Sequence, residues 1–322
     1  MFEVFKNCPP IVEEAKKASF RPVFPLQLLI FIGVFFTISV LQSIPLVVYG
    51  AFLGVRSVMQ GDVQASSLMT TMESHQPALV LLMLFSTGIM TILTIVYCRF
   101  LEKRSLYSMG FTREKMLRDY GLGLVLGFVM FGACVLIAWA GGTLKYNGYI
   151  IGNGWLMLFA FFIGFVIQGM AEEVFLRGYL MISIASRNSI ALAVFVNSIL
   201  FALLHIFNSG ISVLAVINLA LFGVFASLYT LKANSIWGIS AIHSIWNFTQ
   251  GNIFGIKVSG MDSPVSLFSF VPTGEGTLLN GGDFGLEGGL AVTIVLCISI
   301  IAVLLVKGRG VQPIQEPVEE AA

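Results

Sequence analysis

The chain has 322 residues, of which 57% are hydrophobic and 11% charged, and its mean hydropathy is +0.91. An ordinary soluble domain carries about 25% charged residues, so the composition excludes that class. The net charge of +1 gives no indication of a nucleic-acid partner, and we expect none. Apolar residues come in runs of about 20, which as a helix cross ~30 Å of hydrocarbon. The sequence therefore predicts an all-α, polytopic membrane protein.

Eight transmembrane helices are expected along the chain. They are placed at 26–52, 78–97, 120–140, 155–186, 190–207, 211–231, 236–254 and 289–306. A polar segment with both signs of charge precedes them at 1–23, and a polar tail follows at 308–322. We therefore predict a cytoplasmic N-terminal segment, a transmembrane bundle at 24–307 and a cytoplasmic tail.

Lysine and arginine predict the orientation, because they are enriched in cytoplasmic loops. With eight spans, 15 of the 18 Lys and Arg residues fall on the side of the two termini. Both termini are thus expected in the cytoplasm. The long loops 55–77 and 255–287 are expected on the other side, and the second lies over the external mouth of the bundle in this prediction.

The segment Ala171–Leu180, AEEVFLRGYL, places three charged side chains next to an apolar run. Each charge at membrane depth costs roughly 2.5–3.5 kcal/mol on insertion scales, so such residues predict a functional site. Glu173 and Arg177 are four residues apart in the order that favours a salt bridge on a helix. Glu172 is the second acid of the pair.

Two of the three histidines also lie within predicted spans. His205 has Phe201 four residues before it, and His243 has Asn247 four residues after it, so each pair shares a helix face. If the fourth and fifth spans form a hairpin, Glu172 and His205 both lie roughly 22–27 Å from its tip. We therefore expect the acid pair, both imidazoles and the carboxamide to converge in one cavity.

Such a cavity can hydrolyse an amide. A glutamate can take a proton from water, one histidine can orient that water, and the other histidine and the asparagine can stabilise the oxyanion. A glutamate and two histidines are also a ligand set of catalytic zinc. The HExxH and G-x-S-x-G motifs are absent from the sequence.

Other interpretations stay open at this point. Glu173 and Arg177 also suit a purely structural ion pair, and a histidine inside the membrane also suits an interhelical hydrogen bond. A proton-coupled transporter would use the same residues as a relay, although no internal repeat is evident. A non-catalytic scaffold or immunity protein would bind a peptide or a lipidated partner in the cavity.

The three motifs Glu172-Glu173-x-x-x-Arg177, Phe201-x-x-x-His205 and His243-x-x-x-Asn247 resemble the signature of the CPBP family. This family, also called Abi, includes the CAAX proteases and bacteriocin-processing enzymes. The motifs fall in the expected order within about 100 residues, and the resemblance implies a protease core at 153–254 in a bundle of membrane helices.

The resemblance further implies an intramembrane endopeptidase in a bacterial plasma membrane. Glu172 would activate the water, His205 would assist it, and His243 with Asn247 would form the oxyanion pocket. Glu173, Arg177 and Phe201 would support these groups. The family is described both as zinc metalloproteases, with Glu172, His205 and His243 as the ligands here, and as metal-free glutamate enzymes. The expected partners are membrane lipids and a peptide or protein substrate of the CAAX or leader-peptide kind, with or without a lipid group.

Overall fold

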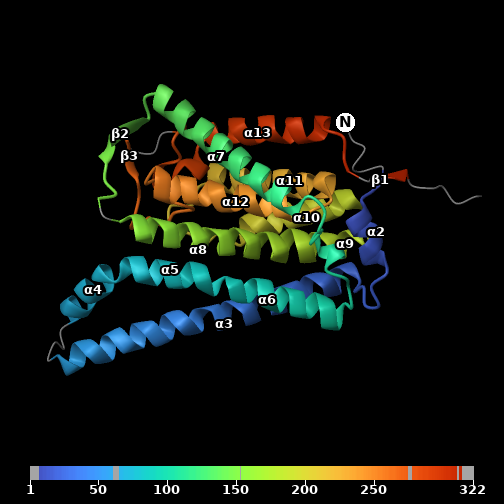
Figure 1. The fold of residues 1–322 in the computed structure, drawn as a ribbon, viewed down its shortest axis with the longest axis horizontal. Helices are drawn as coiled ribbons and strands as arrows, with labels where there is room; N and C mark the ends of the chain where they lie inside the picture. Colours follow the sequence, from blue (N-terminus) through green and yellow to red (C-terminus); the bar gives the residue numbers. More distant parts are fainter. Residues whose placement is uncertain (1–6, 61–64, 153, 275–277, 310–311, 314–322) are drawn as a thin grey trace, which may run out of the picture.

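The computed structural model describes residues 7–60, 65–152, 154–274, 278–309 and 312–313, and it is a bundle of helices (Figure 1). This confirms the all-α membrane bundle. Within the described residues, five helical segments are long and apolar enough to cross a membrane: Phe24–Met59, Gln76–Leu101, Met116–Ala140, Trp155–Ala185 and Val213–Ala233. The helices Ile190–Leu203 and Leu290–Leu305 are apolar but shorter. The number of eight spans therefore stays a prediction.

The N-terminal helices form an outer layer. It contains α3 (Phe24–Met59), α5 (Gln76–Ser86), α6 (Gly88–Val96) and the π-helical turn η1 (Tyr97–Leu101). Figure 1 shows α3 at one edge of the molecule, with α5 and α6 between it and α8 (Trp155–Glu173). The expected loop 55–77 is partly wrong, because α3 continues to Met59 and α4 (Ala65–Ser74) is helical. Residues 61–64 lie outside the described residues.

The inner part of the bundle is built around α12 (Trp237–Phe248), which packs between α7 (Met116–Ala140) and α8. Glycines permit this close packing. A Cβ atom on Gly127 of α7 would lie 2.6 Å from the Ile242 carbonyl oxygen, and one on Gly169 of α8 would lie 2.7 Å from the Ser244 nitrogen. The small-residue spacing at Gly123 and Gly127 thus marks a real helix contact.

Three further helices complete the inner part. They are α10 (Ile190–Leu203), α11 (Val213–Ala233) and α13 (Leu290–Leu305). The Ser189 and Ser212 hydroxyls cap α10 and α11 by accepting hydrogen bonds from backbone N–H groups of the first turn. Asn234 ends α11 in the left-handed conformation, with φ of 51°. Helix α11 packs against α10 and α13, so these three helices form one wall of the bundle.

The helix with the Glu172–Glu173 pair and the helix with His243 and Asn247 both widen into π turns. Helix α8 continues as η3 (Val174–Met181) and the short α9 (Ile182–Ala185), and α12 continues as η4 (Thr249–Ile253). The π turn of α8 begins directly after Glu173, and that of α12 begins two residues after Asn247. Such turns are rare and are frequent at functional sites.

Short elements lie at the two ends of the bundle. At one end are α2 (Pro10–Lys16), η2 (Tyr107–Met109) and the ribbon of β1 (Asn7–Cys8) with β4 (Gln312–Pro313). At the other are the antiparallel ribbon of β2 (Leu144–Tyr149) with β3 (Phe268–Pro272), and the 3₁₀ turns η5 (Gly282–Phe284) and η6 (Leu286–Gly288). The β1–β4 pairing brings residues 7–8 and 312–313 to the same end of the bundle, which agrees with an even number of spans between them.

Candidate active site

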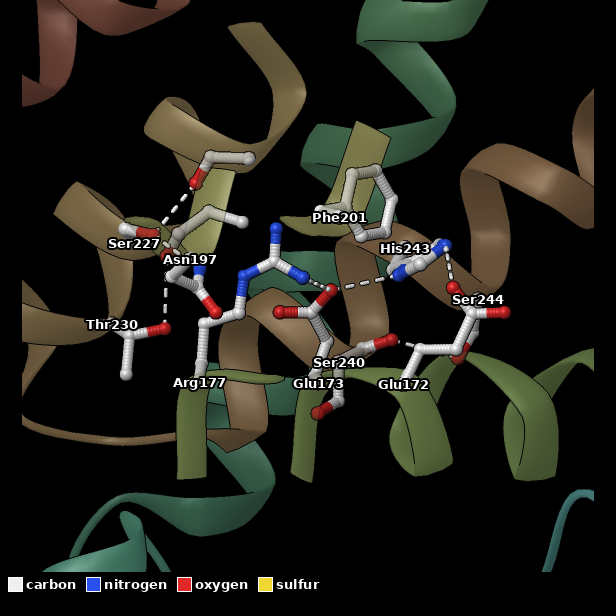
Figure 2. Close-up of polar contacts among 12 residues, drawn as sticks. Glu172, Glu173, Arg177, Asn197, Phe201, Ser227, Thr230, Ser240, His243 and Ser244 are labelled. Carbon is white, nitrogen blue, oxygen red and sulfur yellow. Dashed lines mark hydrogen bonds and ion pairs between the residues drawn. The ribbon is translucent and has the colours of Figure 1, made fainter. Parts of the chain in front are cut away.

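Glu173 lies at the centre of a fully buried polar cluster. Its Oε1 atom is 2.9 Å from Arg177 Nη1 and 2.8 Å from His243 Nδ1, and neither Glu173 nor Arg177 is exposed. Figure 2 shows the carboxylate between the guanidinium and the imidazole. The predicted Glu173–Arg177 salt bridge is therefore present. The carboxylate also orients the histidine, because an acceptor oxygen requires hydrogen on Nδ1 and leaves Nε2 to face the other way.

Glu172 faces the opposite side of His243. Its Oε2 atom is 3.7 Å from His243 Nε2, and 21% of its side chain is exposed. Gln168, one helical turn earlier on α8, donates a hydrogen bond to Glu172 Oε1. Asn247 Nδ2 in turn donates to Gln168 Oε1 at 3.0 Å. Of the two adjacent glutamates, Glu172 is thus the one that solvent or a ligand can reach.

His205 lies outside a helix, so the predicted span 190–207 is wrong at its end. Helix α10 ends at Leu203, and Asn208, Ser209 and Gly210 follow in a turn, where Gly210 has φ of +72°. These residue types favour turns over helix. His205 Nδ1 bonds the free Phe201 carbonyl oxygen at 2.8 Å. This bond again places the hydrogen on Nδ1 and leaves the lone pair of a neutral ring on Nε2.

Aromatic rings surround the charged cluster. The Phe201 ring centroid lies 4.8 Å from His205 and 6.1 Å from His243, and Phe222 lies 5.0 Å from His243. The Arg177 guanidinium carbon is 4.7 Å from the centroid of the Phe201 ring. A cation over an aromatic face is attracted by the ring quadrupole, so Phe201 supports both the arginine and the two imidazoles.

The candidate residues share one cavity of about 210 Å³, which has room for several water molecules. Glu172, Phe201, His205, His243 and Asn247 all line it. These five side chains therefore converge, but the expectation that both acids enter the cavity is wrong for Glu173, which is buried behind His243 and does not line it. The rest of its described wall comes from α5, α8, α11, α12, α13, the turns after α5 and α10, and the segment between η4 and α13. It includes Met83, Gln168, Asn218, Phe222, Val258, Ser259, Glu287 and Leu296.

The proposed zinc ligands do not form a ligand set in the described part of the chain. No group of three His, Cys, Asp or Glu side chains there is arranged to hold one ion. Each histidine has its Nδ1 atom bonded, to Glu173 in one case and to the Phe201 carbonyl in the other, and this leaves the Nε2 atom of each ring available. Because the described residues contain no three-ligand group, we derive no step through a metal.

Sequence reasoning missed three residues of the cavity wall. Gln168 has a usable signal, since it is a lone amide one helical turn before Glu172 in an otherwise apolar run. Phe222 is one of 28 phenylalanines and has no distinguishing spacing. Glu287 lies about 40 residues beyond the last motif, where no local pattern connects it to the site.

A cavity within apolar helices, lined by a carboxylate, two imidazoles and a carboxamide, defines a class of protein. It is a multi-pass membrane protein with ionisable side chains around a cavity inside its helix bundle. The polar groups are held by one another and by neighbouring helices, as expected where water is scarce.

Comparison with known proteins gives a family match. Residues 153–249 match the family model described as "Rce1-like: Type II CAAX prenyl endopeptidase Rce1-like". The match supports the CAAX protease family that the three motifs predicted, which is a family of peptidases. No curated protein and no solved structure matches the chain. The match includes α8 to α12, and the helices before and after it lie outside the matched residues.

Proposed function

We propose that the protein is an intramembrane endopeptidase in which Glu172 activates water to hydrolyse a peptide bond. One observation carries the proposal. Glu172 Oε2 lies 3.7 Å from His243 Nε2 at the wall of a water-sized cavity that His205 and Asn247 also line. These are the groups that such a reaction requires, and they come from two separate helices and a turn.

The proposed reaction has two steps. Glu172 takes a proton from water while the water oxygen bonds to the carbonyl carbon, and the carbonyl oxygen becomes an oxyanion. The carbon–nitrogen bond then breaks as the oxyanion reforms the carbonyl, and the proton on Glu172 passes to the leaving nitrogen. Water has been added across the bond, and the glutamate returns to its starting form.

The hydrogen bonds of the two histidines suggest different roles. In a neutral ring, His205 has its hydrogen on Nδ1, so its Nε2 can accept a hydrogen bond from the attacking water and orient it. His243 also has hydrogen on Nδ1, through its bond to Glu173. It can donate to an oxyanion through Nε2 only as the imidazolium ion, and the two flanking carboxylates favour that charge electrostatically.

Asn247 supplies the second oxyanion donor in this proposal. Its amide nitrogen has two hydrogens, and one bonds Gln168 at 3.0 Å, which leaves the other for a ligand. Gln168 also bonds Glu172, so it fixes the spacing of base and oxyanion donor. Glu173, Arg177 and Phe201 act as positioning residues, because they contact His243 or one another instead of the reacting atoms.

The proposed substrate is a membrane-associated peptide or protein of the CAAX or leader-peptide kind, with or without a lipid group. The cavity wall supports this choice, since Met83, Leu219 and Leu296 give it apolar sides at the depth of the membrane helices. We propose a bacterial plasma membrane with both termini in the cytoplasm, and the distribution of basic residues supports this orientation.

The test compares Glu172→Gln with Glu114→Gln, which alters an exposed carboxylate outside the cavity. Purified proteins in proteoliposomes receive a mixture of prenylated and unprenylated peptides, and mass spectrometry measures the products. Glu172→Gln should lower cleavage by about 10²–10⁴-fold, and Asn247→Ala by about 10²–10³-fold, with unchanged thermal unfolding. Full cleavage by Glu172→Gln would refute the proposal. If the protein binds the peptides but neither the wild type nor any variant cleaves them, a non-catalytic scaffold is favoured.

A chelator separates the metal-free mechanism from a zinc mechanism. We propose that Glu172 acts without a metal, so activity should persist after dialysis against a chelator, with no stoichiometric metal in the purified protein. Activity that disappears with zinc and returns on its addition would overturn this part of the proposal while leaving the endopeptidase itself intact.

A further inference from the structure

A second carboxylate, Glu287, lines the same cavity and has no part in the proposed reaction. It lies in η6, which is outside the family-matched segment. Only 8% of Glu287 is exposed. Together with Glu172 it gives the cavity two acidic side chains that belong to distant parts of the chain.

Glu287 is held in place from one side. Its Oε2 atom accepts hydrogen bonds from the Ser259 backbone nitrogen at 2.7 Å and from the Ser259 hydroxyl at 2.8 Å. Ser259 has φ of 47°, an uncommon conformation for serine that these two bonds stabilise. Within the described residues no hydrogen bond reaches Oε1. The carboxylate is therefore oriented by one oxygen, and the other is free to meet a ligand.

The position of Glu287 relative to the candidate active site follows from α11. Asn218 Nδ2 donates to the Glu287 backbone carbonyl at 2.8 Å. Phe222, four residues later on α11, packs 5.0 Å from the His243 ring. Four residues of α-helix rise ~6 Å. Along the axis of α11, Glu287 therefore lies about one helical turn from the level of His243. About two residues of an extended peptide cover that distance.

Glu172 and Glu287 differ in what faces them, because the His243 imidazolium of the proposed reaction lies beside Glu172, whereas no Lys or Arg of the described lining lies beside Glu287. The described lining of the cavity contains Glu172 and Glu287 but neither Lys nor Arg. The nearby Arg177 is bonded to Glu173 behind the histidine and does not line the cavity. Glu287 therefore places a negative charge beside apolar walls, and a concave site of this kind concentrates ligands of the opposite sign.

We propose that Glu287 is a specificity determinant that binds a positively charged substrate group, a Lys or Arg side chain about two residues from the cleaved bond. This inference rests on the proposed endopeptidase function and deepens it. Glu287 binds the cation through its free oxygen, while its negative charge disfavours a substrate that presents an acidic side chain there.

The experiment uses the full chain in nanodiscs of zwitterionic phosphatidylcholine. The probes are fluorescent apolar peptides of one sequence, with a single Lys, norleucine or Glu placed in turn at each position. Fluorescence anisotropy measures binding, and mass spectrometry measures cleavage. The Lys peptide should bind at least about tenfold more tightly than the norleucine peptide, as expected for a hydrogen bond to a charged group. The preference should shrink as salt rises from about 50 to 500 mM.

Matched variants assign the preference to one side chain. Glu287→Gln removes the charge but keeps an oxygen to accept the Ser259 hydrogen bonds, and it should abolish the preference. Asp262→Asn removes a largely exposed carboxylate from the same external segment, outside the cavity lining, and should leave the preference unchanged. Glu287→Lys should instead favour the Glu peptide.

The outcomes separate the two proposals. An unchanged preference in Glu287→Gln, an equal loss in Asp262→Asn, or no preference for the Lys peptide by the wild-type protein would overturn the inference. Cleavage without any preference would retain the endopeptidase and reject the role of Glu287. A Glu287-dependent preference without cleavage would retain the cation site and reject the endopeptidase. The salt dependence of the Lys preference is measured on the wild-type chain alone. It therefore tests the inference even if a Glu287 variant folds poorly.

Discussion

Helices α3 and α12 are both mainly apolar, yet they use their surfaces in opposite ways. Only five of the 36 residues of α3 are buried, whereas ten of the 12 residues of α12 are, including Ser240, His243, Ser244 and Asn247. In a membrane, apolar side chains need no protein partner, but polar groups need hydrogen bonds from neighbouring helices. The outer layer therefore serves as a lipid-facing wall, and the chemistry is concentrated where helices contact one another on all sides.

The largest expected difference between the two regions concerns arginine. Arg177→Met leaves the buried Glu173 carboxylate with His243 but without its guanidinium, and should destabilise the protein by about 3–5 kcal/mol. The matched change Arg56→Met in the exposed end of α3 should stay within about 0.5 kcal/mol. Equilibrium unfolding by SDS titration in mixed micelles measures both. Similar losses in the two variants would contradict the contrast between layers.

A smaller difference is expected between two helical glycines. A Cβ atom on Gly169 would lie 2.7 Å from the Ser244 nitrogen, so Gly169→Ala should separate α8 from α12 and cost about 1–3 kcal/mol. Gly33 in α3 has no atom within 4 Å of the added Cβ, and Gly33→Ala should stabilise the helix by about 0.5–1 kcal/mol. The same titration should therefore give shifts of opposite sign. Shifts of one sign would show that α8 and α12 adapt to the extra carbon.

The smallest difference concerns phenylalanine. Phe201→Leu removes the ring that faces the Arg177 guanidinium and should cost about 0.5–2 kcal/mol, while also slowing peptide cleavage because both imidazoles lose a packing partner. Phe159 on α8 is 62% exposed, so Phe159→Leu should change stability by less than about 0.5 kcal/mol and leave cleavage unchanged. Equal effects at the two positions would show that the aromatic face is not what stabilises the arginine.

Much of the bundle could be predicted because hydrophobic length alone determines which segments cross a membrane. The fourth span, expected at 155–186, is observed at Trp155–Ala185. Fixed spacing likewise predicted the Glu173–Arg177 pair and the approach of Phe201 to His205. The end of α10 was less predictable, since hydropathy does not distinguish an apolar turn from one more helical turn.

Contacts between distant segments could not be predicted from one sequence. Nothing in the spacing of the motifs indicates that Gln168 bonds both Glu172 and Asn247, or that Glu287 reaches the same cavity. The π turns are also hidden, because nothing in the composition of Val174–Met181 distinguishes a π turn from an α turn. These features depend on how neighbouring helices pack, and local propensity carries little information about that.

The wide turn η3 lets its helix contain one residue more than regular α geometry would allow over the same stretch. A π turn contains about one residue more than an α turn. Deleting one residue from Val174–Met181 would restore α geometry, and later residues would rotate far less than the ~100° expected for a deletion within a regular α-helix. The main change would be local, because the Gly178 carbonyl in this turn accepts a hydrogen bond from the buried Arg104 guanidinium at 2.9 Å. Over evolutionary time a deletion here should therefore weaken the link to Arg104 more than it displaces the glutamates before the turn.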